Sequence, residues 1–239
     1  MPDDPKILAV LIDADNVPAK HADAILKEVT TYGEPGLRRV YGDWSDARLS
    51  GWSKAAHELG LVQHQQSANT KGKNASDIGL VIDAMDILHT GHFDGFVLVS
   101  SDSDFTRLAS RIRENGLTVI GIGERKTPNA LKNACNRFVT IENIYQDTED
   151  TAQSLKDQKL SKNLSNEAEK LILSAMDKID VEGNWYALSR IGHQLLADKP
   201  DFDTRTYGFK KLSDLVRELK GFEIKSEPGK QPQVRTSKR

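Results

Sequence analysis

The sequence predicts an α/β protein with a three-layer α/β/α fold and a mainly parallel sheet, followed by a small winged helix-turn-helix-like domain. In the first part of the chain, short and nearly continuous apolar runs alternate with amphipathic stretches. This is the pattern of parallel strands joined by helices. A polar segment without aromatic residues then interrupts the pattern. Three helical stretches and two short β-like runs follow it, an order that is typical of a winged helix.

The first domain, residues 1–146, is expected to contain six strands, at 7–12, 37–41, 61–64, 96–100, 117–122 and 138–141. Pro18 suits the first position of the helix after the first strand, because the N–H that proline lacks is unpaired there anyway. Helices are expected near 18–32, 46–59, 75–89, 103–115 and 128–135. Ligands of parallel sheets bind outside the carboxyl ends of the strands, so the residues that follow each strand are the candidates for a site.

Residues 147–165 are predicted to be a linker, because this stretch is polar and poor in large aliphatic residues. The domain after it, 166–239, is expected to begin with a helix whose first turn is closed by Asn166 and Glu169, which have capping-box spacing. Two further helices and a hairpin complete this domain, at 188–197, 207–219, 222–225 and 233–236.

Composition excludes several classes of protein. The longest apolar run, 7–12, has six residues, whereas a bilayer span needs about 20. The N-terminus lacks the pattern of a signal peptide. Cys135 is the single cysteine, which excludes an intrachain disulfide, favours a reduced, cytoplasmic setting and suits a small core residue. The sequence contains no zinc-ligand cluster, glycine-rich phosphate loop or serine elbow.

Charge is distributed unevenly along the chain. Residues 1–150 hold 16 basic and 22 acidic residues, whereas 151–239 hold 17 basic and 13 acidic ones. An acidic body followed by a mildly basic module predicts that an anionic partner is bound mainly through the second domain. Solvated surface charge is the simpler alternative.

Acidic residues follow two of the expected strands and one polar loop. Asp13 and Asp15 come after the first strand, Asp102 and Asp104 after the fourth, and Asp77 begins a helix after the loop. At one edge of a parallel sheet these carboxylates would repel one another. A hard divalent cation, Mg²⁺ or Mn²⁺, removes that conflict and can promote displacement at phosphorus.

Each of these residues also has a purely structural interpretation. Asp15 or Asn16 could cap the helix near Pro18, and Ser101 or Asp102 could cap the helix after the fourth strand. Asp77 could offset a helix dipole. Their combination at one edge favours a site, in which Asp15, Asn16 and Ser101 are accessory candidates.

Other acidic residues are assigned differently. Asp83 and Asp86 lie within the helix that begins near Asp77, and we expect them to be solvated or to support the site from behind. Asp43 and Asp46 are expected to cap a helix.

Basic residues flank the expected site. They are candidates for contacts with the phosphate groups of a substrate, because an acidic metal cluster with a basic surround suits a phosphodiester. The candidates are Lys71, Lys73, Arg107, Arg125 and Lys126.

Three motifs resemble those of the NYN domain family, which belongs to the PIN-like nuclease superfamily. They are LIDADN at 11–16, KGKNASDIGLVIDAMD at 71–86 and VSSDSDF at 99–105. The resemblance implies a PIN-like α/β/α fold and metal-dependent RNA cleavage. It also implies metal-binding, catalytic acids at Asp13, Asp77, Asp102 and Asp104, with Asn16 in the same pocket.

Residues 166–236 resemble the LOTUS domain, also called OST-HTH. The matching features include Gly192 and the pair Tyr207 and Gly208. This resemblance implies RNA binding or docking to a protein partner.

The leading prediction is therefore a Mg²⁺- or Mn²⁺-dependent, endoribonuclease-like hydrolase. Two alternatives stay open at this point. The first is a non-catalytic RNA-binding or scaffold protein. The second is a haloacid-dehalogenase-type phosphatase in which Asp13 is the nucleophile and Asp15 the acid.

Overall fold

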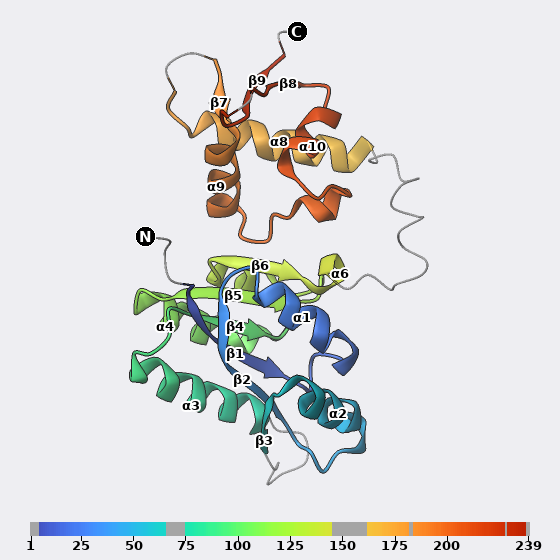
Figure 1. Cartoon of the computed structure of the whole chain (residues 1–239), viewed down its shortest axis with the longest axis vertical. Coiled ribbons are helices and arrows are strands. Elements are labelled where there is room, and N and C mark those ends of the chain that lie inside the picture. Colours follow the sequence, from blue (N-terminus) through green and yellow to red (C-terminus); the bar gives the residue numbers. More distant parts are fainter. Residues whose placement is uncertain (1–4, 66–74, 145–161, 182–183, 228, 238–239) are drawn as a thin grey trace. The chain divides into compact units, whose positions relative to one another are not determined.

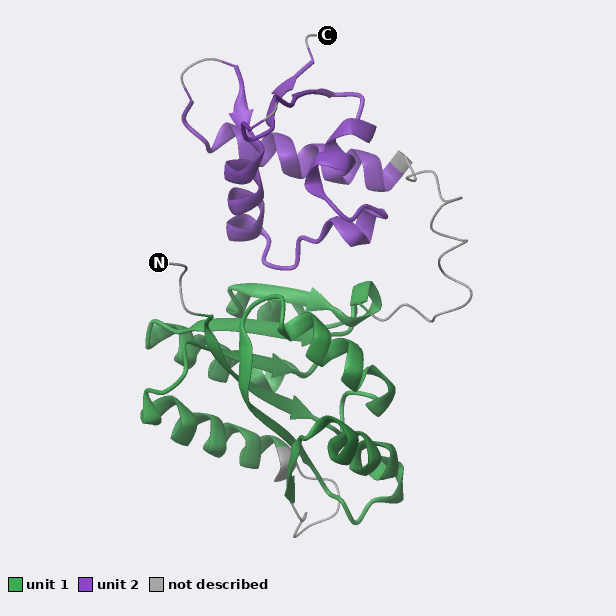
Figure 2. Cartoon of the chain, viewed as in Figure 1, with its two compact units in different colours: residues 1–145 green, residues 146–239 purple. Residues whose placement is uncertain are grey.

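The chain forms two compact units, residues 1–145 and 146–239 (Figure 2). The computed structural model describes residues 5–65, 75–144, 162–181, 184–227 and 229–237. Within these residues, every helix is too short or too polar to cross a bilayer.

The first unit is built on a six-stranded parallel sheet with the strand order β3-β2-β1-β4-β5-β6 (Figure 1). The predicted strands are all present, as β1 (Ile7–Asp13), β2 (Glu34–Gly42), β3 (Val62–Gln65), β4 (Gly95–Val99), β5 (Thr118–Gly123) and β6 (Arg137–Thr140). Every pairing between neighbours is parallel. The predicted α/β fold with a parallel sheet is confirmed.

Strand β2 begins three residues earlier than expected. The segment Glu34-Pro35-Gly36 resembles a turn in sequence, yet Glu34 and Pro35 pair with Ile7 and Leu8. The register shifts between Leu8 and Ala9, and such an irregularity accommodates residues that a regular ladder disfavours.

Helices cover both faces of the sheet because side chains of β1 alternate between them. Leu8, Val10 and Ile12 belong to one core, which is shared by α1 (Ala22–Val29), α2 (Ser50–Leu59) and α6 (Ile141–Ile144). Ala9 and Leu11 belong to the other core, which is shared by α3 (Ala75–Thr90), α4 (Thr106–Glu114) and α5 (Asn129–Ala134). In this unit, short 3₁₀ turns precede α1, α2 and α4. They are η1 (Ala19–His21), η2 (Ala47–Leu49) and η3 (Ser103–Phe105).

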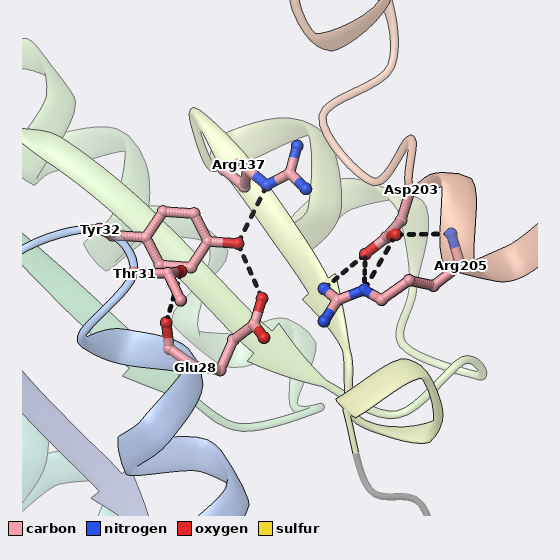
Figure 3. Close-up of polar contacts among 6 residues, drawn as sticks. All are labelled: Glu28, Thr31, Tyr32, Arg137, Asp203 and Arg205. Atoms are coloured by element: carbon pink, nitrogen blue, oxygen red, sulfur yellow. Dashed lines mark hydrogen bonds and ion pairs between the residues drawn. The ribbon is translucent and has the colours of Figure 1, made fainter. Parts of the chain in front are cut away.

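A polar contact connects α1 to the edge strand β6. The Tyr32 hydroxyl donates to Oε1 of Glu28 at 2.9 Å and accepts from Nε of Arg137 at 3.3 Å (Figure 3). Burial raises the pKa of Tyr32. The phenol therefore stays neutral and able to donate.

The second unit has its own core and a small antiparallel sheet with the strand order β7-β9-β8. Its elements are α8 (Lys162–Asp177), β7 (Tyr186–Ala187), α9 (Leu188–Asp198), η4 (Thr204–Tyr207), α10 (Leu212–Glu218), β8 (Phe222–Lys225) and β9 (Gln233–Thr236). The expected hairpin is β8 with β9, and β7 is an additional strand on its edge.

Two local predictions for this unit are wrong. Asn166 and Glu169 do not close a first turn, because α8 already begins at Lys162 and both residues lie inside it. The helix expected over 207–219 is interrupted, since Gly208 takes a φ of 84° after η4 and α10 begins only at Leu212. That left-handed conformation is easy only for glycine and ends a helical turn.

The turn η4 is fixed at its start by a charged side chain. The Asp203 carboxylate accepts from the backbone N of Arg205 at 2.9 Å and from its Nη2 at 2.7 Å (Figure 3). Of the predicted linker, residues 147–161 lie outside the described residues and 162–165 form the start of α8. The proposed domain bounds stay a prediction.

Candidate nuclease site

Two neighbouring central strands lead to helices on opposite faces of the sheet, and the candidate site lies where these two connections separate. Strand β1 leads to α1 on one face of the sheet, whereas its neighbour β4 leads to α4 on the opposite face (Figure 1). Ligands of open parallel sheets bind at such a switch point, outside the carboxyl ends of the strands. The residues after β1 and β4 are those that the sequence singled out.

Asp13 ends β1 and is held in one orientation. It is 1% exposed, and Oδ2 accepts from Nδ2 of Asn16 at 2.7 Å and from Oγ of Ser100 at 2.8 Å. Oδ1 accepts from the backbone N of Asp15 at 3.2 Å and of Asn16 at 3.3 Å. Burial raises the pKa of Asp13, while the hydrogen bonds from Asn16 and Ser100 act in the opposite direction.

Ser100 joins the two acidic loops. Its hydroxyl donates to Asp13 and accepts from the backbone N of Asp102 at 3.0 Å. Sequence reasoning did not assign Ser100 to the site, although its position directly after β4 was a usable signal. Asp102 also caps η3 by accepting from the backbone N of Asp104 at 2.9 Å, so the capping interpretation is confirmed for this residue. Ser101 instead accepts from the backbone N of Glu124 at 2.9 Å.

Asp77, in the first turn of α3, is under the electrostatic influence of the other predicted acids. Burial raises the pKa of Asp77 to about 6, and repulsion by Asp13, Asp102, Asp15 and Asp104 adds to the shift. Asp77 on α3 is thus close enough to the carboxylates of β1 and of the β4–α4 loop for their charges to raise its pKa. Over the described ranges, no group of three or more His, Cys, Asp or Glu side chains is arranged to hold a metal ion.

Comparison with known families agrees with this arrangement. Residues 7–142 match the NYN domain. The chain belongs to the NYN domain family. NYN domains are PIN-like nucleases, so the resemblance noted in the sequence is confirmed. Residues 159–234 match the OST-HTH/LOTUS domain, and LOTUS domains bind RNA.

A solved structure shares the fold of part of this chain. A protein of unknown function from Vibrio parahaemolyticus is 22% identical, with a TM-score of 0.50 over 59% of this chain and 96% of that one. At this identity the likeness shows the fold alone. No curated protein matches the chain.

Asp83 holds the NYN helix α3 against the sheet, which sequence reasoning missed. It was expected to be solvated or to support the site, yet its carboxylate accepts from Nη1 of Arg39 and from the hydroxyl of Tyr41, both on β2. The His64 Nδ1 lies 3.9 Å from the same carboxylate. Arg39 and Tyr41 are two residues apart on β2, so their side chains lie on the same face of the sheet. This spacing is a signal that could have revealed the contact. The expectation for Asp86 is confirmed, since it is exposed.

The basic residues predicted to contact RNA have different surroundings from one another. Lys71 and Lys73 lie outside the described residues. Arg107 is exposed in the first turn of α4. The backbone N of Arg125 donates to the Glu142 carboxylate at 2.9 Å. Lys126 is exposed and its Nζ lies 2.7 Å from Oε2 of Glu124.

Asp46 and Cys135, which were expected to have structural roles, have such roles. Asp46 caps η2, accepting from the backbone N of Arg48 at 2.8 Å. The same expectation for Asp43 is wrong, because its carboxylate instead accepts from the side chains of Ser45 and Gln65. Cys135 is 1% exposed, and burial raises the pKa of its thiol to about 12. A thiol that stays protonated at neutral pH is a poor nucleophile.

Proposed function

We propose that this protein is an endoribonuclease that hydrolyses RNA phosphodiester bonds with a divalent cation, Mg²⁺ or Mn²⁺. Asp13, Asp77, Asp102 and Asp104 would hold the cation. The observation that carries the proposal is the contact between the two acidic loops, in which the Ser100 hydroxyl donates to Asp13 and accepts from the backbone N of Asp102. The raised pKa of Asp77, to which both of these aspartates contribute, supports it. Carboxylates gathered in this way favour a bound cation. Membership of a family of PIN-like nucleases supports RNA hydrolysis.

The donor set fits a hard cation. The groups at the sheet edge are carboxylate, amide and hydroxyl oxygens, which Mg²⁺ and Mn²⁺ prefer over nitrogen or sulfur. Magnesium binds through one or two carboxylates and keeps several waters, so a closed protein cage is not needed. When bound, the cation would offset negative charge and lower the pKa of an attacking water.

The chain itself supplies orientation. The side chains of Asn16 and Ser100 donate to Oδ2 of Asp13, the backbone N–H groups of Asp15 and Asn16 donate to Oδ1, and Ser100 also accepts from the backbone N of Asp102. Such prearranged groups do not need to reorganise during the reaction. Asp83 fixes the helix that carries Asp77. Asp15, Asn16 and Ser101 are accessory in this proposal.

RNA would be bound by both units. In the NYN domain, we propose phosphate contacts from Lys71, Lys73, Arg107, Arg125 and Lys126. The LOTUS domain would supply most of the affinity, because residues 151–239 carry more basic than acidic residues while the rest of the chain is acidic. Docking of a protein partner to the LOTUS domain is the alternative role.

The decisive experiment is cleavage of labelled RNA by the full chain with Mn²⁺ or Mg²⁺. We expect cleavage that EDTA abolishes and that is lost in Asp13→Asn and Asp102→Asn. Asp86→Asn is the matched control, because it removes an exposed acid of the same unit that lies outside the site. RNA binding without cleavage by the wild type would instead identify a non-catalytic RNA-binding protein.

Removal of residues 150–239 tests the division between the units. The first unit has its own two cores, so it should fold alone. We expect weaker RNA binding and a residual metal-dependent activity on short RNA. Undiminished binding by the truncated chain would contradict the proposed role of the LOTUS domain.

A further inference from the structure

The segment between β2 and α2 lies beside the loop that carries Asp13. Strands β1 and β2 are adjacent and parallel, and the backbone N of Ala14 donates to the carbonyl of Tyr41 at 2.9 Å. Farther along, the indole Nε1 of Trp52 donates to the carbonyl of Val17 at 2.6 Å in a buried hydrogen bond. The connection 43–49 therefore runs next to residues 14–19 at the carboxyl edge of the sheet.

Trp44 places an aromatic ring at this edge. A Cβ added to Gly42 would lie 3.5 Å from Cη2 of Trp44 and 3.3 Å from Cβ of Ala14. The six-membered ring of the indole thus lies over the end of β2, on the same side of Gly42 as Ala14. Trp44 is partly buried and packs against the core, so it offers a fixed ring rather than a mobile one.

The backbone around Trp44 is also held in place. Its N donates to Oε1 of Gln65 at 3.1 Å, and Asp43 accepts from Nε2 of Gln65 at 2.9 Å. The Asp43 carboxylate accepts from the Ser45 hydroxyl at 2.6 Å as well. Preorganised binding groups lose little conformational entropy when a ligand binds.

Arg48 adds a cation close to the acidic loop. Its side chain is 85% exposed, and Nε and Nη2 donate to Oδ2 of Asp46 at 2.8 and 2.6 Å. A guanidinium has five N–H donors, so donors are left for a ligand. The Asp46 carboxylate raises the pKa of Arg48, and Asp15 adds to this effect, which agrees with the adjacency of the two loops.

We propose that Trp44 and Arg48 form a subsite for one nucleotide of single-stranded RNA, next to the bond that is cleaved. The indole would stack on an unpaired base and the guanidinium would bind the adjoining phosphate. A carboxylate cluster repels RNA, so a cation beside the cluster would attract the RNA backbone to this edge of the sheet. Stacking needs a base that is free of its duplex, which makes single-stranded RNA the substrate class. This inference rests on the proposed ribonuclease function.

The test uses the full chain and a short single-stranded RNA of about six nucleotides that contains 4-thiouridine. Ultraviolet crosslinking in EDTA, followed by mass spectrometry of peptides, should place a crosslink on the peptide that contains Trp44. In binding measured by fluorescence anisotropy with residues 1–149, which lack the LOTUS domain, Trp44→Ala should weaken affinity about 10- to 100-fold, while Trp44→Phe stays within about threefold. Arg48→Ala should lower the salt dependence of log Kd by about 0.7.

Lys54→Ala is the matched control, because Lys54 is another exposed cation, on the helix α2 that follows this segment. It should bind as the wild type does. Circular dichroism checks folding of Trp44→Ala, and Trp44→Phe and Arg48→Ala keep the test valid if that variant unfolds.

Two outcomes separate the proposals. If the wild type cleaves RNA but crosslinks elsewhere, and Arg48→Ala binds as the wild type does, the subsite is wrong and the nuclease proposal stands. If the wild type neither binds nor cleaves single-stranded RNA, the proposed function itself fails.

Discussion

Two aspartates on helix α3 have opposite surroundings. Asp77 lies in the first turn, where the charged groups that shift its pKa are other carboxylates. Asp83, six residues later, accepts from Arg39 and Tyr41 of β2. An aspartate is therefore repelled by other carboxylates at position 77 and paired with a cation at position 83. A strained carboxylate is suited to binding a cation, whereas a neutralised one is suited to holding the helix in place.

The largest expected effect comes from Asp77→Asn. Loss of a carboxylate that is proposed to hold the cation should lower the rate of RNA cleavage at least about 100-fold, since even supporting residues of metal sites cost 10- to 100-fold. Thermal unfolding without metal should show no loss of stability, because the repulsion is relieved. Retained cleavage would remove Asp77 from the site.

Asp83→Asn should act on stability instead. It leaves the Arg39 guanidinium, 27% exposed, without its anionic partner, and breaking a largely buried pair is strongly destabilising. We expect the free energy of unfolding to fall by about 2–3 kcal/mol, measured by urea denaturation. A stability equal to that of the wild type would show that α3 does not depend on this contact.

Tyr41→Phe tests the weaker half of the same contact. It removes one hydrogen bond to Asp83 while keeping the buried ring, so the free energy of unfolding should fall by about 1 kcal/mol. A loss as large as that of Asp83→Asn would mean that the hydrogen bond from Tyr41, rather than the ion pair with Arg39, holds α3 against the sheet.

The pH dependence of stability should report on Asp77. The pKa of Asp77 is raised from 3.8 to about 6, so the folded state binds its proton more tightly than the unfolded state does. Its stabilising contribution is present below pH 4 and is lost as the pH rises through about 6. Because Asp77 is partly exposed, we expect only about 1 kcal/mol after allowance for solvent screening.

This effect is measured as the difference between the wild type and Asp77→Asn in metal-free denaturation between pH 4 and 7.5. The wild type should lose stability relative to the variant over this range, and Mg²⁺ at pH 7.5 should restore it by binding the folded state. Parallel curves for the two proteins would contradict the assigned shift.

Much of the fold could be predicted because its signals are local. Each apolar run of the sheet is a strand, since a buried parallel strand needs apolar residues on both faces. The acids after β1 and β4 were predictable for a related reason, because strands that run in parallel end at the same edge. The errors also had local causes: Glu34-Pro35-Gly36 resembles a turn, and the spacing of Asn166 and Glu169 resembles a cap.

What the sequence by itself determined is the order of the elements, the families of both domains and the acids that stand at the ends of β1 and β4. The tertiary structure alone decided which acids are strained and which are paired. Arg39 and Asp83 are 44 residues apart in the chain, and Ser100 and Asp13 are 87 apart. No spacing rule reports such pairs, because they form only when the sheet brings β2 under α3 and β4 beside β1.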